Sequence, residues 1–145
     1  MAAITSSDAK RIVDDILSTN NEILAISIID QKGGNILAAK SKDSFKKAFG
    51  VTRDGDKYGG TLALAALSIV NEVKEVVGEA KAIITIYKNC KMMLLPVQSY
   101  EILVGLVLEP SVNAEDYSIA NKIERLLADI TTTTNKSSSS YSSNL

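Results

Sequence analysis

The spacing of apolar residues over the first 60 positions predicts one helix followed by a two-stranded hairpin. Apolar side chains recur at helical intervals from Ala9 to Leu17, with Ser6 or Ser7 as the N-terminal cap. The isoleucine-rich segment 23–29 predicts a mostly buried strand, and a polar, glycine-containing turn leads into a short strand at 36–39. Residues 40–60 form a long polar connection that can hold one turn of helix at 44–49.

The remaining pattern predicts a long helix, three strands and a final helix. The long helix runs from Thr61 to Val77 and ends at Gly78, which suits a C-terminal cap. Strands are predicted at 82–87, 92–97 and 102–108, and the last two are apolar at odd and even positions alike. Both faces of their sheet therefore need a covering layer, and Gly105 is expected to let a helix approach closely. The final helix follows Asn113 and buries one apolar stripe that ends at Ile130.

These elements predict an α+β fold with the order helix-β-β-helix-β-β-β-helix. The five strands form one antiparallel sheet with helices on both faces. Residues 1–130 are enough for a single domain of ordinary size. Residues 131–145 are rich in serine and threonine, and we expect them to form a disordered tail.

The long helix carries apolar residues on two sides. The broader stripe is expected to cover the sheet and consists of Leu62, Ala65, Ala66, Ile69, Val70, Val73, Val76 and Val77. Leu64 and Leu67 point with Asn71 toward the opposite side, which makes them candidates for a protein interface. Alternatively, these two leucines are scattered surface residues or lie beneath the 40–60 connection.

Composition limits the chemistry available to this chain. The absence of histidine removes Ser-His and Cys-His nucleophile systems and the usual zinc sites. The adjacent carboxylates Asp14 and Asp15 diverge on a helix, as do Glu115 and Asp116, and do not converge on a substrate. We therefore expect no enzyme, with no catalytic residue, no metal and no cofactor.

One segment between the predicted hairpin and the long helix invites a bound anion or a partner. Two cations and two glycines precede the predicted helix start, where free N–H groups favour negative charge. The residues concerned are Arg53, Lys57, Gly59, Gly60 and Thr61. The segment lacks the lysine and hydroxyl residue that complete a nucleotide P-loop. A simple turn with a helix cap is the alternative interpretation.

Charge and targeting signals suggest a cytoplasmic protein. The formal net charge is −1, and the small lysine excess in 40–57 has too few aromatic neighbours for nucleic-acid binding. The N-terminus lacks a signal peptide, and no apolar run approaches the length of a membrane span. Cys90 is the only cysteine, so no intramolecular disulfide can form. We expect no direct membrane anchoring.

The element order resembles that of the roadblock family of dynein light-chain-like proteins, whose fold is related to profilin and longin domains. The resemblance covers about residues 7–130. It rests on the strand and turn at 26–38, on the long helix from Thr61, and on the strand at 102–108 that leads into 109–113.

The resemblance implies a non-catalytic module that pairs with itself or with a related domain through long helices and an edge strand. It also implies small GTPases, or their regulatory complexes, as partners. Mapped onto this chain, the dimer seam lies near Leu64, Leu67, Asn71, Ile84 and Ile86. The alternative is a PAS-like or profilin-like sensor that holds a small ligand between sheet and helix, where Ser27, Thr85 and Tyr87 are the polar strand residues.

Overall fold

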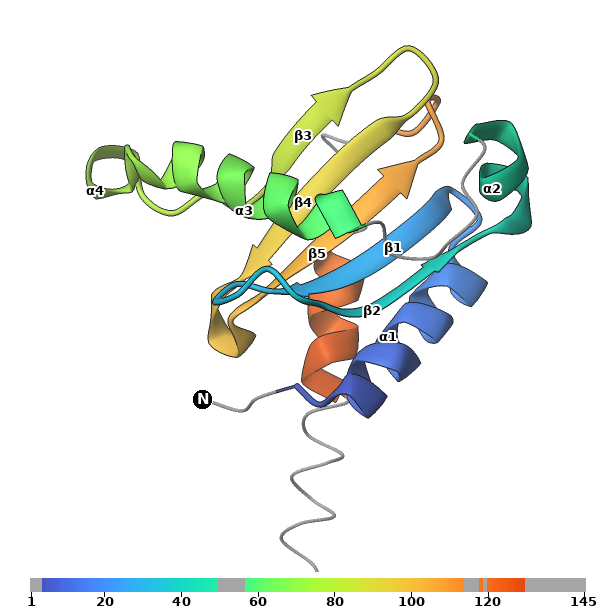
Figure 1. Ribbon diagram of the computed structural model, residues 1–145, viewed down its shortest axis with the longest axis horizontal. Coiled ribbons are helices and arrows are strands. Elements are labelled where there is room, and N and C mark those ends of the chain that lie inside the picture. The colour runs from blue at the N-terminus through green and yellow to red at the C-terminus, as the bar shows by residue number, and fades with distance from the viewer. Residues whose placement is uncertain (1–3, 50–56, 114–117, 119, 130–145) are drawn as a thin grey trace, which may run out of the picture.

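A single antiparallel sheet of five strands organises the computed structural model, which describes residues 4–49, 57–113, 118 and 120–129 (Figure 1). The strands are β1 (Ile23–Asp30), β2 (Ile36–Ser41), β3 (Ile83–Ile86), β4 (Lys91–Val97) and β5 (Ile102–Leu108). Their order is β2-β1-β5-β4-β3, so the hairpin and the meander join where β1 pairs with β5. The predicted α+β fold with one antiparallel sheet is confirmed.

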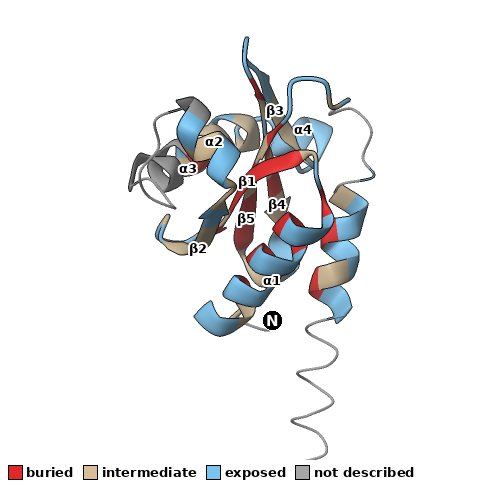
Figure 2. Cartoon of the chain, turned by 90° about the vertical axis from the view of Figure 1, so that its right-hand side faces the viewer, coloured by how far each residue is buried: buried red, intermediate tan, exposed pale blue. Residues whose placement is uncertain are grey.

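Helix α1 (Ser6–Thr19) and a C-terminal helix at 120–129 cover one face of the sheet (Figure 2). The α1 residues predicted to face the core are buried there: Ala9, Ile12, Val13, Ile16 and Leu17. They pack in one cluster with Ile28, Val104 and Leu106 of the central strands and with Ile123 and Leu127 of the C-terminal helix. The N-terminal cap is Thr5, one residue before the predicted serines, and its hydroxyl accepts the Asp8 N–H at 3.0 Å.

The opposite face of the sheet is covered by the longest of the three helices between β2 and β3. The 44–49 segment is a helix, α2 (Asp43–Phe49), followed by α3 (Lys57–Asn71) and the single turn α4 (Lys74–Val77). The prediction of one continuous helix from Thr61 to Val77 was wrong at both ends of α3. The helix begins four residues earlier, and it breaks at Glu72 and Val73.

Several sequence predictions fall outside the described residues. The expected first turn of the final helix at 114–117 is one of them, as are Ile119 and Ile130 of its apolar stripe. The 131–145 tail and Arg53 are others. Of the predicted stripe, Ile123 and Leu127 are buried and Leu126 is half-buried, which agrees with a helix packed on the sheet.

Gly105 accommodates a neighbouring strand residue rather than a helix, which corrects the sequence expectation. It pairs with Ser27 across the β1–β5 ladder. A Cβ atom at position 105 would lie 2.8 Å from the Ser27 hydroxyl oxygen and 3.6 Å from a Leu94 methyl carbon. The first distance is shorter than a van der Waals contact, so only glycine leaves room for Ser27 at this point of the central sheet.

We expect Gly105→Ala to lower the free energy of unfolding by about 1–3 kcal/mol, because the added methyl group overpacks the sheet. The double variant with Ser27→Ala removes the oxygen atom and should recover most of that loss. Urea denaturation of the single and double variants measures both effects. Equal destabilisation with and without Ser27→Ala would contradict the steric cause.

Candidate protein interface

The inner side of α3 is narrow and packs on the sheet. Ala63 and Leu67 are buried in a cluster with Ile29 of β1 and Leu103 of β5, and Leu64 and Val70 pack against it while half-buried. The spacing of 63, 67 and 70 is that of one helical stripe. Leu67 is only 7% exposed, so the prediction that it faces solvent was wrong. Asn71 is also half-buried.

The outer side of α3 and the turn α4 present apolar side chains to solvent. We call this set the helical patch: Ile69, Val73, Val76 and Val77, which are 72%, 53%, 87% and 75% exposed. The charged residues Glu72, Lys74 and Glu75 are exposed among them. A run of exposed apolar side chains with polar neighbours is typical of a surface that another protein covers.

The sequence could have suggested the helical patch, because α3 is apolar on two sides. A helix that is apolar all round is normally buried all round. We assigned the broader stripe to the sheet, whereas the sheet contacts Ala63 and Leu67, which lie outside that stripe, together with Val70 from its margin. Stripe width was therefore a poor guide to which side of α3 meets the core.

The helix break separates α4 from the support of the sheet. The Glu72 N–H donates to the Ile69 carbonyl at 3.3 Å, and no side chain caps α4 at Val73. The N–H of Gly78 donates to the Lys74 carbonyl at 2.8 Å and closes the turn. None of the α4 residues is buried. In Figure 1, α4 lies beyond the outline of the sheet, on the side where β3 is the edge strand.

Within the described residues, β3 is an edge strand whose one pairing partner is β4. Of its predicted interface residues, Ile84 is half-buried and packs against the core, whereas Ile86 is 72% exposed. Tyr87, which follows Ile86, and Met92, which pairs with Thr85 and so lies on the opposite face of the hairpin from Ile86, are also exposed; we call these three residues the hairpin-tip group. An edge strand with exposed apolar residues is a template for pairing with another chain.

The predicted anion or partner segment is helical where it is described. Lys57, Gly59, Gly60 and Thr61 lie within the first two turns of α3 rather than ahead of a helix. The expected turn before Thr61 is therefore absent over these four residues. Contact with an anion or a partner remains a prediction that nothing in the fold tests.

Among the described residues, two titratable side chains have shifted pKa values, and neither is made reactive by its shift. Burial raises the pKa of the Cys90 thiol, which keeps it protonated and weakly nucleophilic. The hydrogen bond from Lys32 to Glu101, at 3.0 Å, raises the pKa of the exposed Lys32 ammonium and joins two turns at one end of the sheet. Over the described residues, no group of three or more acidic or cysteine side chains could hold a metal ion.

No helix in the described part of the chain combines the length and apolar character needed to cross a membrane. This finding concerns the helices alone.

Comparison with known proteins identifies the fold. No protein-family model matches the chain, and no curated protein matches its sequence. Among solved structures, Myxococcus xanthus MglB has a TM-score of 0.66 at 10% identity and covers 94% of each chain. A roadblock/LC7 domain from Streptomyces avermitilis has a TM-score of 0.62 at 6% identity, covering 86% of this chain and 96% of the domain. An MglB structure with a tetrameric arrangement has a TM-score of 0.65 at 14% identity, covering 90% of this chain and 92% of that one. The chain therefore has the fold of roadblock/LC7 domains, as its resemblance to the roadblock family implies.

Proposed function

We propose that this chain is a non-catalytic adaptor that forms a dimer through α3, α4 and the β3 edge, and that binds a small GTPase or its regulatory complex. The observation that carries the proposal is the position of α4, with the exposed Val76 and Val77 of the helical patch, beyond the β3 edge of the sheet. Exposed apolar residues beside the free edge of a strand favour binding of a second copy whose own edge strand extends the same sheet.

In the proposed dimer, a two-fold axis beside β3 would bring the hairpin-tip group of one copy toward the helical patch of the other. Antiparallel pairing of two β3 strands would place the end of one strand next to the start of the other. The hairpin-tip group lies at the end of β3 and in the turn and strand after it, whereas α4 precedes the start of β3 along the chain. Each hairpin tip would thus lie near α4 of the partner copy, so one symmetric contact would cover both apolar groups.

The proposed GTPase partner rests on the resemblance to the roadblock family, and the fold supports it. The tetrameric arrangement of one MglB structure supports self-association within this fold, while a related domain could replace the second copy in a heterodimer. The proposed interface uses one face and one edge of the sheet, which leaves α1 and the C-terminal helix exposed on the other face for a further partner.

The proposal is tested first by the solution mass of the full chain, measured by light scattering after size exclusion over a range of concentrations. We expect twice the monomer mass of 15.5 kDa at every concentration. Immobilised protein should then retain a small GTPase from a lysate of its own source, identified by mass spectrometry, and recombinant GTPase should bind in a nucleotide-dependent way. A monomer throughout would contradict the dimer, and failure of purified GTPases to bind in either nucleotide state would contradict the proposed partner.

A further inference from the structure

A cleft lies between α1 and the C-terminal helix, on the face of the sheet away from α3. It is open to solvent and has a volume of about 240 Å³, and its apolar lining comes from the buried Ile16 of α1 and Ile123 of the C-terminal helix and from the half-buried Leu126. Two ionisable residues, Asp15 from one helix and Lys122 from the other, line the same cleft. A concave apolar surface with a few convergent polar groups is the usual form of a small-molecule site.

One of the polar residues that line this cleft, Asn20, is buried. Asn20 is the only buried polar side chain among the described residues, and it lines the cleft. Its amide nitrogen donates to the Ile16 carbonyl at 2.8 Å and to the Thr19 hydroxyl at 3.1 Å, so both of its N–H donors are used. Its amide oxygen accepts from the Lys122 ammonium at 3.5 Å. This long contact places the exposed Lys122 ammonium beside the cleft, with further ammonium donors available.

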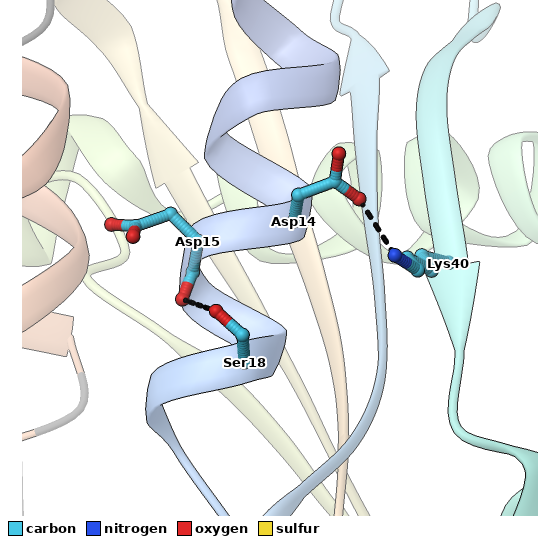
Figure 3. Close-up of polar contacts among 4 residues, drawn as sticks. All are labelled: Asp14, Asp15, Ser18 and Lys40. Atoms are coloured by element: carbon cyan, nitrogen blue, oxygen red, sulfur yellow. Dashed lines mark hydrogen bonds and ion pairs between the residues drawn. The ribbon is translucent and has the colours of Figure 1, made fainter.

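The two neighbouring aspartates of α1 differ in their surroundings (Figure 3). Asp14 forms an ion pair with Lys40 of β2 at 2.9 Å. The Asp15 side chain extends away from that pair, and no described cation lies within ion-pair distance of its carboxylate. The cleft therefore presents one carboxylate and one ammonium that are not paired with each other.

From this arrangement we propose that the cleft binds a small zwitterion, an apolar α-amino acid. The ammonium group of the ligand would meet the exposed Asp15, its carboxylate would meet the exposed Lys122, and its side chain would lie on the half-buried Leu126, beneath which Ile16 and Ile123 are buried. The cleft volume of about 240 Å³ is that of about eight molecules of liquid water, which is enough space for an amino acid the size of leucine. The site lies between two helices, not between sheet and helix as the sensor alternative expects.

Leucine is the first probe, and the full chain is titrated with it by calorimetry and by thermal denaturation. We expect saturable binding and a rise of a few degrees in the melting temperature at about 10 mM leucine. Asp15→Asn and Lys122→Gln should each weaken binding by about tenfold, because each removes one charge-assisted hydrogen bond. The matched control is Asp14→Asn, which removes the neighbouring carboxylate and should leave leucine affinity unchanged.

Ligand analogues separate the two charges: leucinamide lacks the carboxylate, isovalerate lacks the ammonium, and both should bind more weakly than leucine. The proposal is overturned if none of the twenty amino acids raises the melting temperature. That result is expected if Asp15 and Lys122 pair with each other in solution and leave no charge for a ligand. Equal leucine affinity in the wild type and in Asp15→Asn would overturn it as well. Because the cleft lies on the face opposite α3, either failure leaves the proposed dimer and GTPase tests unaffected.

Discussion

Leu67→Asp should lower the free energy of unfolding by about 4 kcal/mol or more, which is a large part of the stability of an ordinary domain. Leu67 is 7% exposed and packs against Ile29 and Leu103, so the substitution removes apolar burial and places a carboxylate in the core. Chemical denaturation at a fixed protein concentration measures the change.

The matched control for Leu67→Asp is Ile69→Asp, two residues further along α3. Ile69 is 72% exposed, and its substitution should change the unfolding free energy of the single chain by no more than about 1 kcal/mol. This pair of variants tests which side of α3 meets the sheet. Comparable destabilisation by both substitutions, measured at a protein concentration low enough for the chain to be monomeric, would contradict the orientation of α3.

The second large effect concerns assembly. Val76→Asp combined with Val77→Asp should weaken dimerisation by about a hundredfold or more, because two desolvated apolar side chains of the proposed interface become charged. The fold should persist, since no residue of α4 is buried. Light scattering over a dilution series gives the dissociation constant, and circular dichroism verifies that the variant is folded.

A control for added charge is the pair Ser7→Asp and Asn121→Asp, which introduces two carboxylates at exposed positions of α1 and the C-terminal helix. Its dimerisation should match that of the unmodified chain. If the valine variant dimerises as strongly as this control, the helical patch does not form the interface.

Local pattern was sufficient to predict most of the fold. The five strands are recognisable because they are short apolar runs separated by polar turns, and α1 because its apolar residues follow one helical stripe. The break at Glu72 and Val73 was not predictable in this way, since neither residue is a glycine or proline. It depends on where α3 passes the edge of the sheet and loses its packing partners.

The candidate sites were less predictable than the fold. When a helix has two apolar stripes, its sequence does not show which of them packs on the sheet. For this reason Leu67 was assigned to the wrong side of α3. The cleft depends on Asp15 and Lys122, which are more than a hundred residues apart in sequence and meet only through tertiary packing. Periodicity contains no information about such distant pairs.

The pairing of β1 with β5 has a consequence for how the chain folds. These strands form the centre of the sheet, and their register places Ile28 opposite Val104, so the core includes contacts between residues 76 positions apart. When only the β1–β2 hairpin has emerged from the ribosome, β5 has not yet been synthesised. The edge of β1 that later pairs with β5 is therefore still exposed. Completion of the core must wait for Ile102–Leu108, and closure of so long a loop predicts slow folding relative to a helical bundle of the same size.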